Sequence, residues 1–399
     1  MKHLFLLTLS VVLISGCTAA RKPELVGLDY GELVANRKAL RASSGAKALQ
    51  PAYDKLLANA DKYLAAAPDM VTDGVLPPSG DSHDFVAIGK YSWPNPETPD
   101  SLPWIRIDCK INPDAYGDKY DLERYNRTMA NIKTLSLAWF YSQEEKYAVK
   151  AAELLRVWFI DEATRMNPNF EYASYLPGVY DGMAIGIIFG STLVELIDHI
   201  KLISLSDSWT ENDDNAMKKW FSGYTKWLLE SDFGIKEGKA KNNHGTWYAA
   251  QVAASALYTG EIQYAKDMVE LGKKQIEQQI NQEGGLPAEL KRDWAYHYSI
   301  YAMQGFTALA LCADHVGVDL WNYKTTDGRG LQLAFGFLQP YLSDEKPWTV
   351  GEIQEGSKPN ISALSIMRLA MKKYPSASFD KTVDYLYSIV PAGTISVLQ

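Results

Sequence analysis

The sequence predicts an all-α protein built from stacked helical hairpins that curl into a toroid or solenoid. Three observations support this fold class. Helical hydrophobic periodicity recurs along the chain, strand signals are scarce, and Gly, Pro and Asn or Asp breaks separate the periodic segments. The connections are short, so successive helices are expected to lie antiparallel. A chain of 399 residues with this pattern can bury one continuous core, and no sequence repeat of fixed period is visible.

The periodic segments predict roughly a dozen helices. They are expected over residues 29–41, 47–66, 121–142, 145–160, 179–203, 209–230, 245–258, 261–281, 293–316, 328–342, 360–374 and 377–389. The apolar run 182–194 is too short to span a membrane and is typical of an inner helix. Its glycines, Gly182, Gly186 and Gly190, allow close packing. No β-rich tail follows the last helix, so a separate sandwich domain is not expected.

The longest non-helical stretch, 68–119, contains many prolines and several aromatic residues. A loop of this length inside a compact domain is usually functional or disordered, and its aromatic content argues against disorder. Tyr91 and Trp93 lie in the middle of it, and aromatic rings stack on the apolar faces of sugars. The loop is expected either to form one wall of a carbohydrate cleft or to pack onto the helices as hydrophobic cover.

The N-terminus has the pattern of an export signal. A short basic start is followed by an apolar stretch and then by Ile14-Ser15-Gly16-Cys17. We expect residues 1–16 to be a bacterial lipoprotein signal peptide, Cys17 to carry lipid, 17–28 to be a tether and 29–399 to be a single catalytic domain. The protein is then exported and lipid-anchored in the cell envelope. An ordinary signal peptide with an incidental cysteine is the alternative.

The formal net charge of −8 argues against nucleic acid as a partner. An acidic protein can still bind an acidic polymer through a locally basic cleft. Two groups of basic residues, each beside one of the two motifs described below, fit such a cleft: Lys236, Lys239 and Lys241, and Lys291 and Arg292. A solvated charged loop is the alternative.

Neither the cysteines nor the histidines suggest a metal centre. Cys109 and Cys312 could pair in an exported protein, but their spacing does not demand it. Beyond the signal segment no two histidines have ligand spacing on one helix. These histidines are His83, His199, His244, His297 and His315. We therefore expect no metal site and no cofactor.

The stretch Lys241–Tyr248 is the centre of the predicted site. Asn242 and Asn243 precede an apolar helical run, so a helix is expected to begin there, with His244 in its first turn. A helix start has unpaired N–H groups and a partial positive charge, which suits an anionic ligand. Asn-Asn-His adds amide donors and an imidazole, a group that titrates near neutral pH. A plain helix cap followed by a hydrogen-bonded structural histidine is the alternative.

A second stretch, Gly284–Tyr301, contains the segment Leu286-Pro287-Ala288-Glu289-Leu290-Lys291-Arg292 and then a run of tyrosines. Together the two stretches resemble the alginate lyase family, whose members have an Asn-Asn-His turn and then a Leu-Pro-x-Glu-Leu-x-Arg … Tyr segment. Two further segments resemble the wider family: 91–96 with 102–108 and 112–113, and 158–159 with 164–169. The four motifs follow the family's order and cover roughly residues 80–320.

The resemblance implies an incomplete (α/α) toroid of roughly six to seven helical hairpins and a β-elimination reaction on a uronic-acid polymer. It also implies that Asn243 and His244 are the active-site Asn-His pair and that Arg292 is the arginine of the second motif. No metal or organic cofactor is required by this chemistry.

The catalytic tyrosine has two candidates. Many family members place it seven residues after the arginine, where this chain has Ser299. Aligning backwards from the segment that begins at Tyr301 assigns the role to Tyr298, whereas a local Ala-Tyr-His pattern favours Tyr296. Tyr298 shares a helix face with Trp294 and Tyr301, and Tyr296 points away, which favours Tyr298.

The side chains around these four are expected to bind substrate. The predicted substrate-binding residues are Tyr91, Trp93, Lys239, Lys241, Trp247, Glu289, Tyr296, His297 and Tyr301. Arg292 and the lysines are expected to lower the pKa of Tyr298 so that it can take a proton. Tyr298 would then serve as base and acid for mannuronate, whereas His244 would be the base and Tyr298 the acid for guluronate.

The expected substrate is therefore an acidic polysaccharide, alginate above all. Three alternatives remain. The chain could act on another uronan such as glucuronan. It could be a glycoside hydrolase on the same toroid, which needs a pair of carboxylates such as Glu237, Glu289, Asp181 or Glu355. It could also be a lipoprotein that binds glycans without cleaving them. The sequence leaves the oligomeric state open.

Overall fold

The computed structural model describes residues 22–42, 47–353, 361–391 and 393–398. Within them the chain forms α1 (Tyr30–Arg41), α2 (Gln50–Leu64), β1 (Val86–Ile88), β2 (Ser92–Trp93), β3 (Ile105–Arg106), α3 (Asp121–Ser142), α4 (Glu145–Phe159), β4 (Tyr172–Tyr175), α5 (Thr192–Ile203), α6 (Glu211–Glu230), α7 (Asp232–Glu237), α8 (Asn243–Thr259), α9 (Ile262–Gln279), α10 (Pro287–Leu290), α11 (Ala295–His315), α12 (Leu331–Leu342), α13 (Ser362–Lys373) and α14 (Asp380–Ile389). Four 3₁₀ segments complete it: η1 (Val71–Asp73), η2 (Pro113–Tyr116), η3 (Ala184–Ser191) and η4 (Ile395–Leu398).

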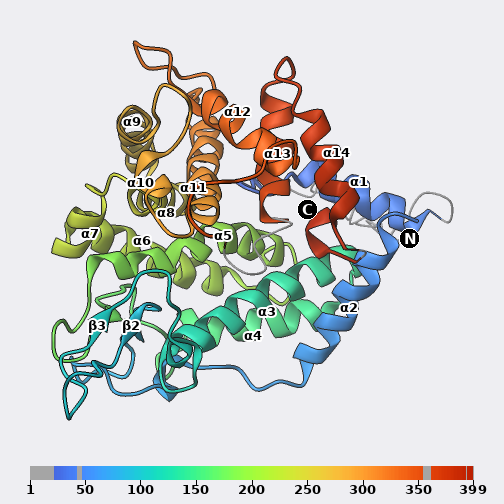
Figure 1. Ribbon diagram of the computed structural model, residues 1–399. Coiled ribbons are helices and arrows are strands. Elements are labelled where there is room, and N and C mark those ends of the chain that lie inside the picture. Colours follow the sequence, from blue (N-terminus) through green and yellow to red (C-terminus); the bar gives the residue numbers. More distant parts are fainter. Residues whose placement is uncertain (1–21, 43–46, 354–360, 392, 399) are drawn as a thin grey trace, which may run out of the picture.

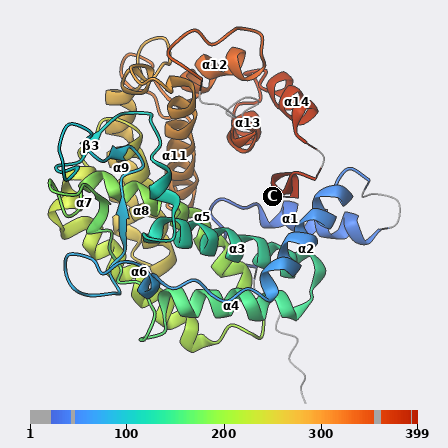
Figure 2. The same ribbon diagram turned by 60° about the horizontal axis from the view of Figure 1, so that its bottom comes forward.

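The helices follow one another around an open ring (Figures 1 and 2). From α1 and α2 the chain passes through α3 and α4, then α6, α8, α9 and α11, and returns through α12–α14 toward its start. The two ends of the described chain lie against each other. Asn36 on α1 and Tyr141 on α3 donate hydrogen bonds to the carbonyl of Leu398, and Arg368 on α13 forms an ion pair with Glu32 on α1. The predicted all-α toroid is confirmed.

Helix α8 lies at the centre of the core. Most of its residues are buried, and it packs against α11, α9, α6 and α5. Alanines dominate its surface at 249, 250, 253, 254 and 256, and all five are fully buried. Small side chains let four neighbours approach the same helix closely. The N-terminus of α8 is thereby held in a fixed position at one end of the core.

The predicted helix 179–203 is wrong over its first half. A 3₁₀ helix, η3, covers 184–191, and only 192–203 is α-helical. A Cβ on Gly182 would lie 1.8 Å from the carbonyl oxygen of Glu171, and one on Gly186 would lie 2.5 Å from the Cβ of Ala173. The segment packs tightly against β4, and this contact, rather than the periodicity of its own apolar residues, determines that the backbone forms a 3₁₀ helix there.

The long loop 68–119 is ordered by two small strand pairs. Strand β1 runs parallel to β4, and β2 pairs antiparallel with β3, with Ser92 opposite Arg106. Burial of Phe85 and Tyr91 fastens the loop to the helices. The loop therefore lies as a fixed cover on one side of the ring, below α6 and α7 in the view of Figure 1.

The segment 22–28 packs against the domain, although it was expected to be part of a tether. Leu25 and Val26 are buried. The backbone N–H groups of Val26, Gly27 and Leu28 donate to the carboxylate of Asp198 on α5, at 2.6–2.8 Å. Three charge-assisted hydrogen bonds to one buried carboxylate fix this part of the chain. The predicted signal peptide 1–16 and Cys17 lie outside the described residues.

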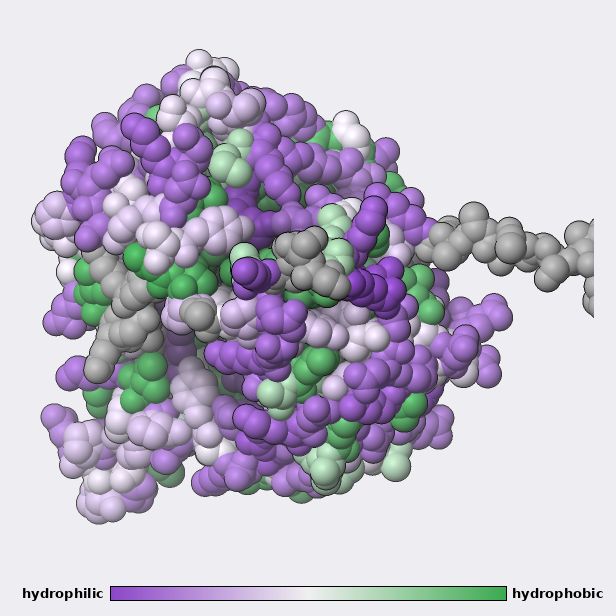
Figure 3. All heavy atoms as spheres, turned by 90° about the vertical axis from the view of Figure 1, so that its right-hand side faces the viewer, coloured by the Kyte–Doolittle hydropathy of each residue, from purple (hydrophilic) through white to green (hydrophobic). Residues whose placement is uncertain are grey.

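The face that carries α1, α2 and α14 is mostly hydrophilic, with small scattered hydrophobic patches (Figure 3). No helix in the described ranges is long and apolar enough to cross a bilayer. Cys109 and Cys312 are buried free thiols.

Candidate active site

The predicted helix start at Asn242 is present. Asn242 caps α8, and its side-chain oxygen accepts a hydrogen bond from the backbone N–H of His244 at 3.2 Å. Asn243 is the first residue of the helix and is 1 % exposed, while His244 is half-buried in the first turn. The cap, the buried amide and the imidazole are thus fixed together at the positive end of the central helix.

Glu289 on α10 holds Asn243. The backbone N–H of Asn243 donates to Oε1 of Glu289 at 2.6 Å, and its side-chain Nδ2 lies 2.9 and 3.0 Å from the two carboxylate oxygens. Burial raises the pKa of Glu289, and the bonds from Asn243 oppose this rise. Because a carboxylate only accepts, the amide nitrogen must point toward it. Glu289 therefore fixes the orientation of the Asn243 amide.

Glu237, the last residue of α7, makes an equivalent contact with His244. Its Oε1 lies 2.6 Å from Nδ1 of His244, and its side chain is 3 % exposed. An ionised carboxylate at this position accepts the Nδ1 proton, so Nε2 of His244 carries the lone pair. The imidazole is therefore oriented to take a proton on the side away from Glu237.

Tyr298 lies on α11 with its hydroxyl hydrogen-bonded to that of Tyr91 from the long loop. The guanidinium of Arg292 stands 3.8 Å from the centre of the Tyr298 ring. Burial raises the pKa of Tyr298, while the bond from Tyr91 and the charge of Arg292 lower it by less. The expectation of a lowered pKa is wrong, because burial outweighs the nearby positive charge. Tyr298 is protonated in the resting site.

Arg292 forms a two-pronged ion pair with Asp108. Its Nε and Nη2 donate to the two carboxylate oxygens at 2.8 and 2.7 Å. Burial alone would lower the pKa of Arg292, but the bonds to Asp108 and the field of Tyr298 raise it. The pair ties the long loop to the segment just before α11, and it holds the guanidinium over the face of the Tyr298 ring.

Lys90 supplies a further positive charge that was not predicted. Its Nζ lies 4.9 Å from the ring centre of Tyr91 and 5.7 Å from that of Tyr298. Burial and the charge of Arg292 lower its pKa. Burial and the same two cations lower the pKa of His297 to about 4, so this imidazole is neutral. In the sequence, the feature that could have indicated Lys90 as a site residue is its position directly before Tyr91.

These side chains surround one cavity of about 510 Å³ between the long loop, η3, α8 and α11. All four residues predicted to be catalytic line it, together with three predicted to bind substrate. These are Asn243, His244, Arg292, Tyr298, Tyr91, His297 and Tyr301. Lys90, Arg106, Asp108 and Glu237 also line it and were not assigned to it beforehand. Arg106 and Asp108 lay within the family-like segment 102–108, which was the signal available for them.

Six residues predicted to bind substrate lie outside the lining. Glu289 is buried behind Asn243, and Trp247 supports the cavity wall by donating from Nε1 to the carbonyl of Tyr301 at 3.0 Å. Trp93 donates to the carbonyl of Lys110 within the loop. The remaining three are Lys239 and Lys241, which are exposed, and Tyr296, which is buried against Trp348 with ring centres 5.2 Å apart.

The described ranges contain no cluster of three or more His, Cys, Asp or Glu side chains able to hold a metal ion.

A helical toroid whose central helix begins with an Asn-His pair, facing a tyrosine and an arginine across a cavity, defines a polysaccharide lyase. The family comparison agrees: the model of the Alginate lyase family matches residues 69–348. The chain belongs to the alginate lyase family, and it is an enzyme of the polysaccharide lyase class.

Solved structures extend this similarity over nearly the whole chain. The crystal structure of an alginate lyase from Bacteroides ovatus is 33 % identical, with a TM-score of 0.88 over 94 % of this chain and 99 % of that one. Alginate lyase A1-III from Sphingomonas species A1 is 16 % identical and shares the fold, with a TM-score of 0.58 over 90 % and 95 %. A variant of A1-III complexed with tetrasaccharide is 15 % identical, with a TM-score of 0.53 over 84 % of each chain. No curated protein matches the chain.

Proposed function

We propose that the enzyme cleaves alginate, at mannuronate and also guluronate linkages, by a metal-independent β-elimination that leaves 4,5-unsaturated uronate ends. The observation that carries the proposal is the meeting of Tyr298, His244 and Asn243 with three cationic side chains around one cavity. The name of the Bacteroides ovatus relative supports alginate as the polymer.

The reaction first needs groups that offset the substrate carboxylate. The proton at C5 is a weak acid while the neighbouring carboxylate keeps its full charge, and the charge grows as the proton leaves. Asn243 at the N-terminus of α8 and Lys90 both line the cavity, so the helix dipole and a cationic side chain are available to offset this charge. Because Asp108 occupies Nε and Nη2 of Arg292, we assign Arg292 mainly to Tyr298 and Lys90 to the substrate carboxylate.

The reaction then needs a base and an acid. The C5–H bond breaks, its electrons form the C4–C5 double bond, and the C4–O4 bond breaks with a proton passing to O4. In guluronate, where proton and leaving oxygen lie on opposite faces, His244 takes the proton at Nε2 and Tyr298 donates to O4. In mannuronate both lie on one face. Tyr298 first loses its hydroxyl proton to solvent, and the phenolate, stabilised by Tyr91 and Arg292, takes the C5 proton and passes it to O4. Every step uses a side chain of the protein.

The hydrolase alternative is less consistent with the contacts. Glu237 is engaged by His244 and Glu289 by Asn243, and both carboxylates are buried. Asp181 lies in a neighbouring cavity, and Glu355 lies outside the described residues. A hydrolase needs two carboxylates that reach the same glycosidic bond.

Purified polymannuronate, polyguluronate and glucuronan, each incubated with the enzyme, provide the test. We expect ultraviolet absorbance from the unsaturated product on the two alginate polymers and little on glucuronan. His244→Ala and Asn243→Ala should each remove most of this activity while the protein stays folded. New reducing ends without absorbance would show a hydrolase, and binding without any product would show a glycan-binding protein.

We also propose that lipid on Cys17 anchors the protein in the cell envelope, which rests on the sequence Ile14-Ser15-Gly16-Cys17. Cys17→Ala should move the protein from the membrane to the soluble fraction. Unchanged fractionation would contradict the anchor.

A further inference from the structure

A second cavity of about 610 Å³ adjoins the active site. Arg106 and Ile185 line both cavities, so the two meet at these residues. The second cavity lies between β3, the turn before η3, and α7. A substrate longer than one sugar must extend beyond the catalytic cavity, and the second cavity shares two wall residues with it.

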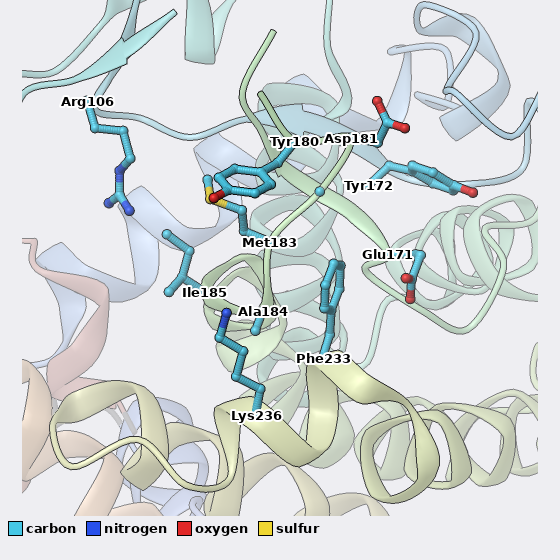
Figure 4. A pocket seen from close by; sticks show the side chains of 11 residues that line it. Arg106, Glu171, Tyr172, Tyr180, Asp181, Met183, Ala184, Ile185, Phe233 and Lys236 are labelled. Atoms are coloured by element: carbon cyan, nitrogen blue, oxygen red, sulfur yellow. The ribbon is translucent and has the colours of Figure 1, made fainter. Parts of the chain in front are cut away.

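The part of the second cavity nearest the active site is basic. Figure 4 shows the guanidinium of Arg106 and the ammonium of Lys236 pointing toward Ile185 from opposite sides. Both side chains are exposed. Among the described residues, no carboxylate forms an ion pair with either of them. Two cations without a protein partner, aimed at one space, suit a ligand carboxylate.

The rest of the second cavity is lined by aromatic and acidic side chains. Tyr180 is 56 % exposed and Phe233 is half-buried, so aromatic surface is available for the apolar face of a sugar ring. Glu171 and Asp181 lie on the side away from Arg106 and Lys236 (Figure 4). Glu171 already accepts a hydrogen bond from Nε1 of Trp227 at 3.1 Å. These carboxylates repel a second acidic group but accept hydrogen bonds from hydroxyls.

We infer that this cavity is a binding subsite for one uronate residue beyond the bond that is cleaved. The uronate carboxylate lies between Arg106 and Lys236, its ring packs on Tyr180 and Phe233, and its hydroxyls face Glu171 and Asp181. The inference rests on the proposed function, because it takes the catalytic cavity as the place where the same polymer is cut. It explains why an acidic enzyme retains a pair of cations at this exit.

Lys236 provides the sharper test, because Arg106 also lines the catalytic cavity. Losing one charge-assisted contact should raise KM for polymannuronate about tenfold in Lys236→Gln, and reversing the charge in Lys236→Glu should raise it roughly a hundredfold. The effect should fall on KM rather than kcat, and it should vanish with the shortest cleaved oligomers, which do not reach the subsite. Lys266→Gln, an exposed lysine on α9 that lines neither cavity, is the matched control.

Two results would overturn the subsite. One is a KM for polymer in both Lys236 variants equal to that of the wild type. The other is an equal rise in KM for the shortest oligomers, which would place the effect in the catalytic cavity. If the wild type forms no unsaturated product from any uronan, the proposed function has failed instead. Calorimetric titration of Lys236→Glu and wild type with intact polymannuronate then tests the subsite by itself. A weaker Kd for the variant supports the subsite, and an unchanged Kd contradicts it.

Discussion

Glu237→Gln tests the assignment of His244 more sharply than removal of the histidine. The buried carboxylate contacts Nδ1 at 2.6 Å, so it both orients the ring and offsets the positive charge that forms when Nε2 takes a proton. Gln keeps the size of the side chain and removes the charge. A hydrogen bond to a charged group contributes about 1.5–3 kcal/mol and a neutral one about 1 kcal/mol.

The difference of about 1–2 kcal/mol predicts a kcat on polyguluronate that is lower by about 5- to 30-fold. If the Gln amide instead presents its NH₂ to Nδ1, the ring changes tautomer and Nε2 loses its lone pair. The loss then approaches the roughly 10²–10⁴-fold typical of a missing general base. KM should change little in either case, because the Glu237 carboxylate is 3 % exposed and is already engaged by Nδ1 of His244.

Initial rates from the ultraviolet assay, measured for the wild type, both single variants and the double variant, complete the experiment. In the His244→Ala background, Glu237→Gln should lower kcat by less than about twofold, because the two residues act as one unit. Glu230→Gln on α6, where the side chain is exposed, is the control for a simple change of charge. Full additivity of the two substitutions, or a wild-type kcat for Glu237→Gln, would refute the reasoning.

The structure makes three further predictions. Tyr298→Phe should lose at least about 10²-fold in kcat, whereas Tyr296→Phe should stay within about tenfold of wild type, and the reverse order of rates would assign the chemistry to Tyr296. Burial lowers the pKa of His199 to about 3, below its unfolded value of about 6.5, so the stability it contributes is present above pH 6.5 and is lost as pH falls toward 3. His199→Gln should flatten the fall of the unfolding free energy in this window by up to about 5 kcal/mol in urea titrations, and an unchanged slope would contradict a neutral buried imidazole. Gly186→Ala should destabilise by about 1–3 kcal/mol because its Cβ overlaps β4, while Gly336→Ala, which meets nothing within 4 Å, should stabilise by about 0.5–1 kcal/mol; thermal melts that rank the two alike would refute the packing argument.

Local signals in the sequence were sufficient for much of the helical framework. The segment 121–142 was predicted with the bounds that α3 has, and the start of α8 at Asn243 followed from its asparagine cap. Such features depend on neighbours within a turn or two along the chain. The 3₁₀ helix η3 was missed because its path is decided by contact with β4, which no local periodicity records.

In the active site, too, local features could be predicted from the sequence and contacts between distant residues could not. Tyr298 could be preferred over Tyr296 from helical geometry alone, because the two differ by roughly 200° around one helix. The partner of Arg292 could not be found, since Asp108 precedes it by 184 residues. The same holds for Tyr91 and Tyr298, which are 207 residues apart in the chain and share a hydrogen bond. The direction of the Tyr298 pKa depends on how deeply the folded chain buries it, and the sequence contains no measure of that depth.

The three hydrogen bonds from residues 26–28 to Asp198 have a consequence for where the enzyme can act. Cys17 precedes Val26 by nine residues, and a fully extended stretch of that length spans about 30 Å. If Cys17 carries the lipid proposed above, Val26, which is fixed to the domain, lies within about 30 Å of the bilayer. The enzyme can then cut only those strands of polymer that come to the cell, and the freed oligosaccharides are released within reach of whatever takes them up.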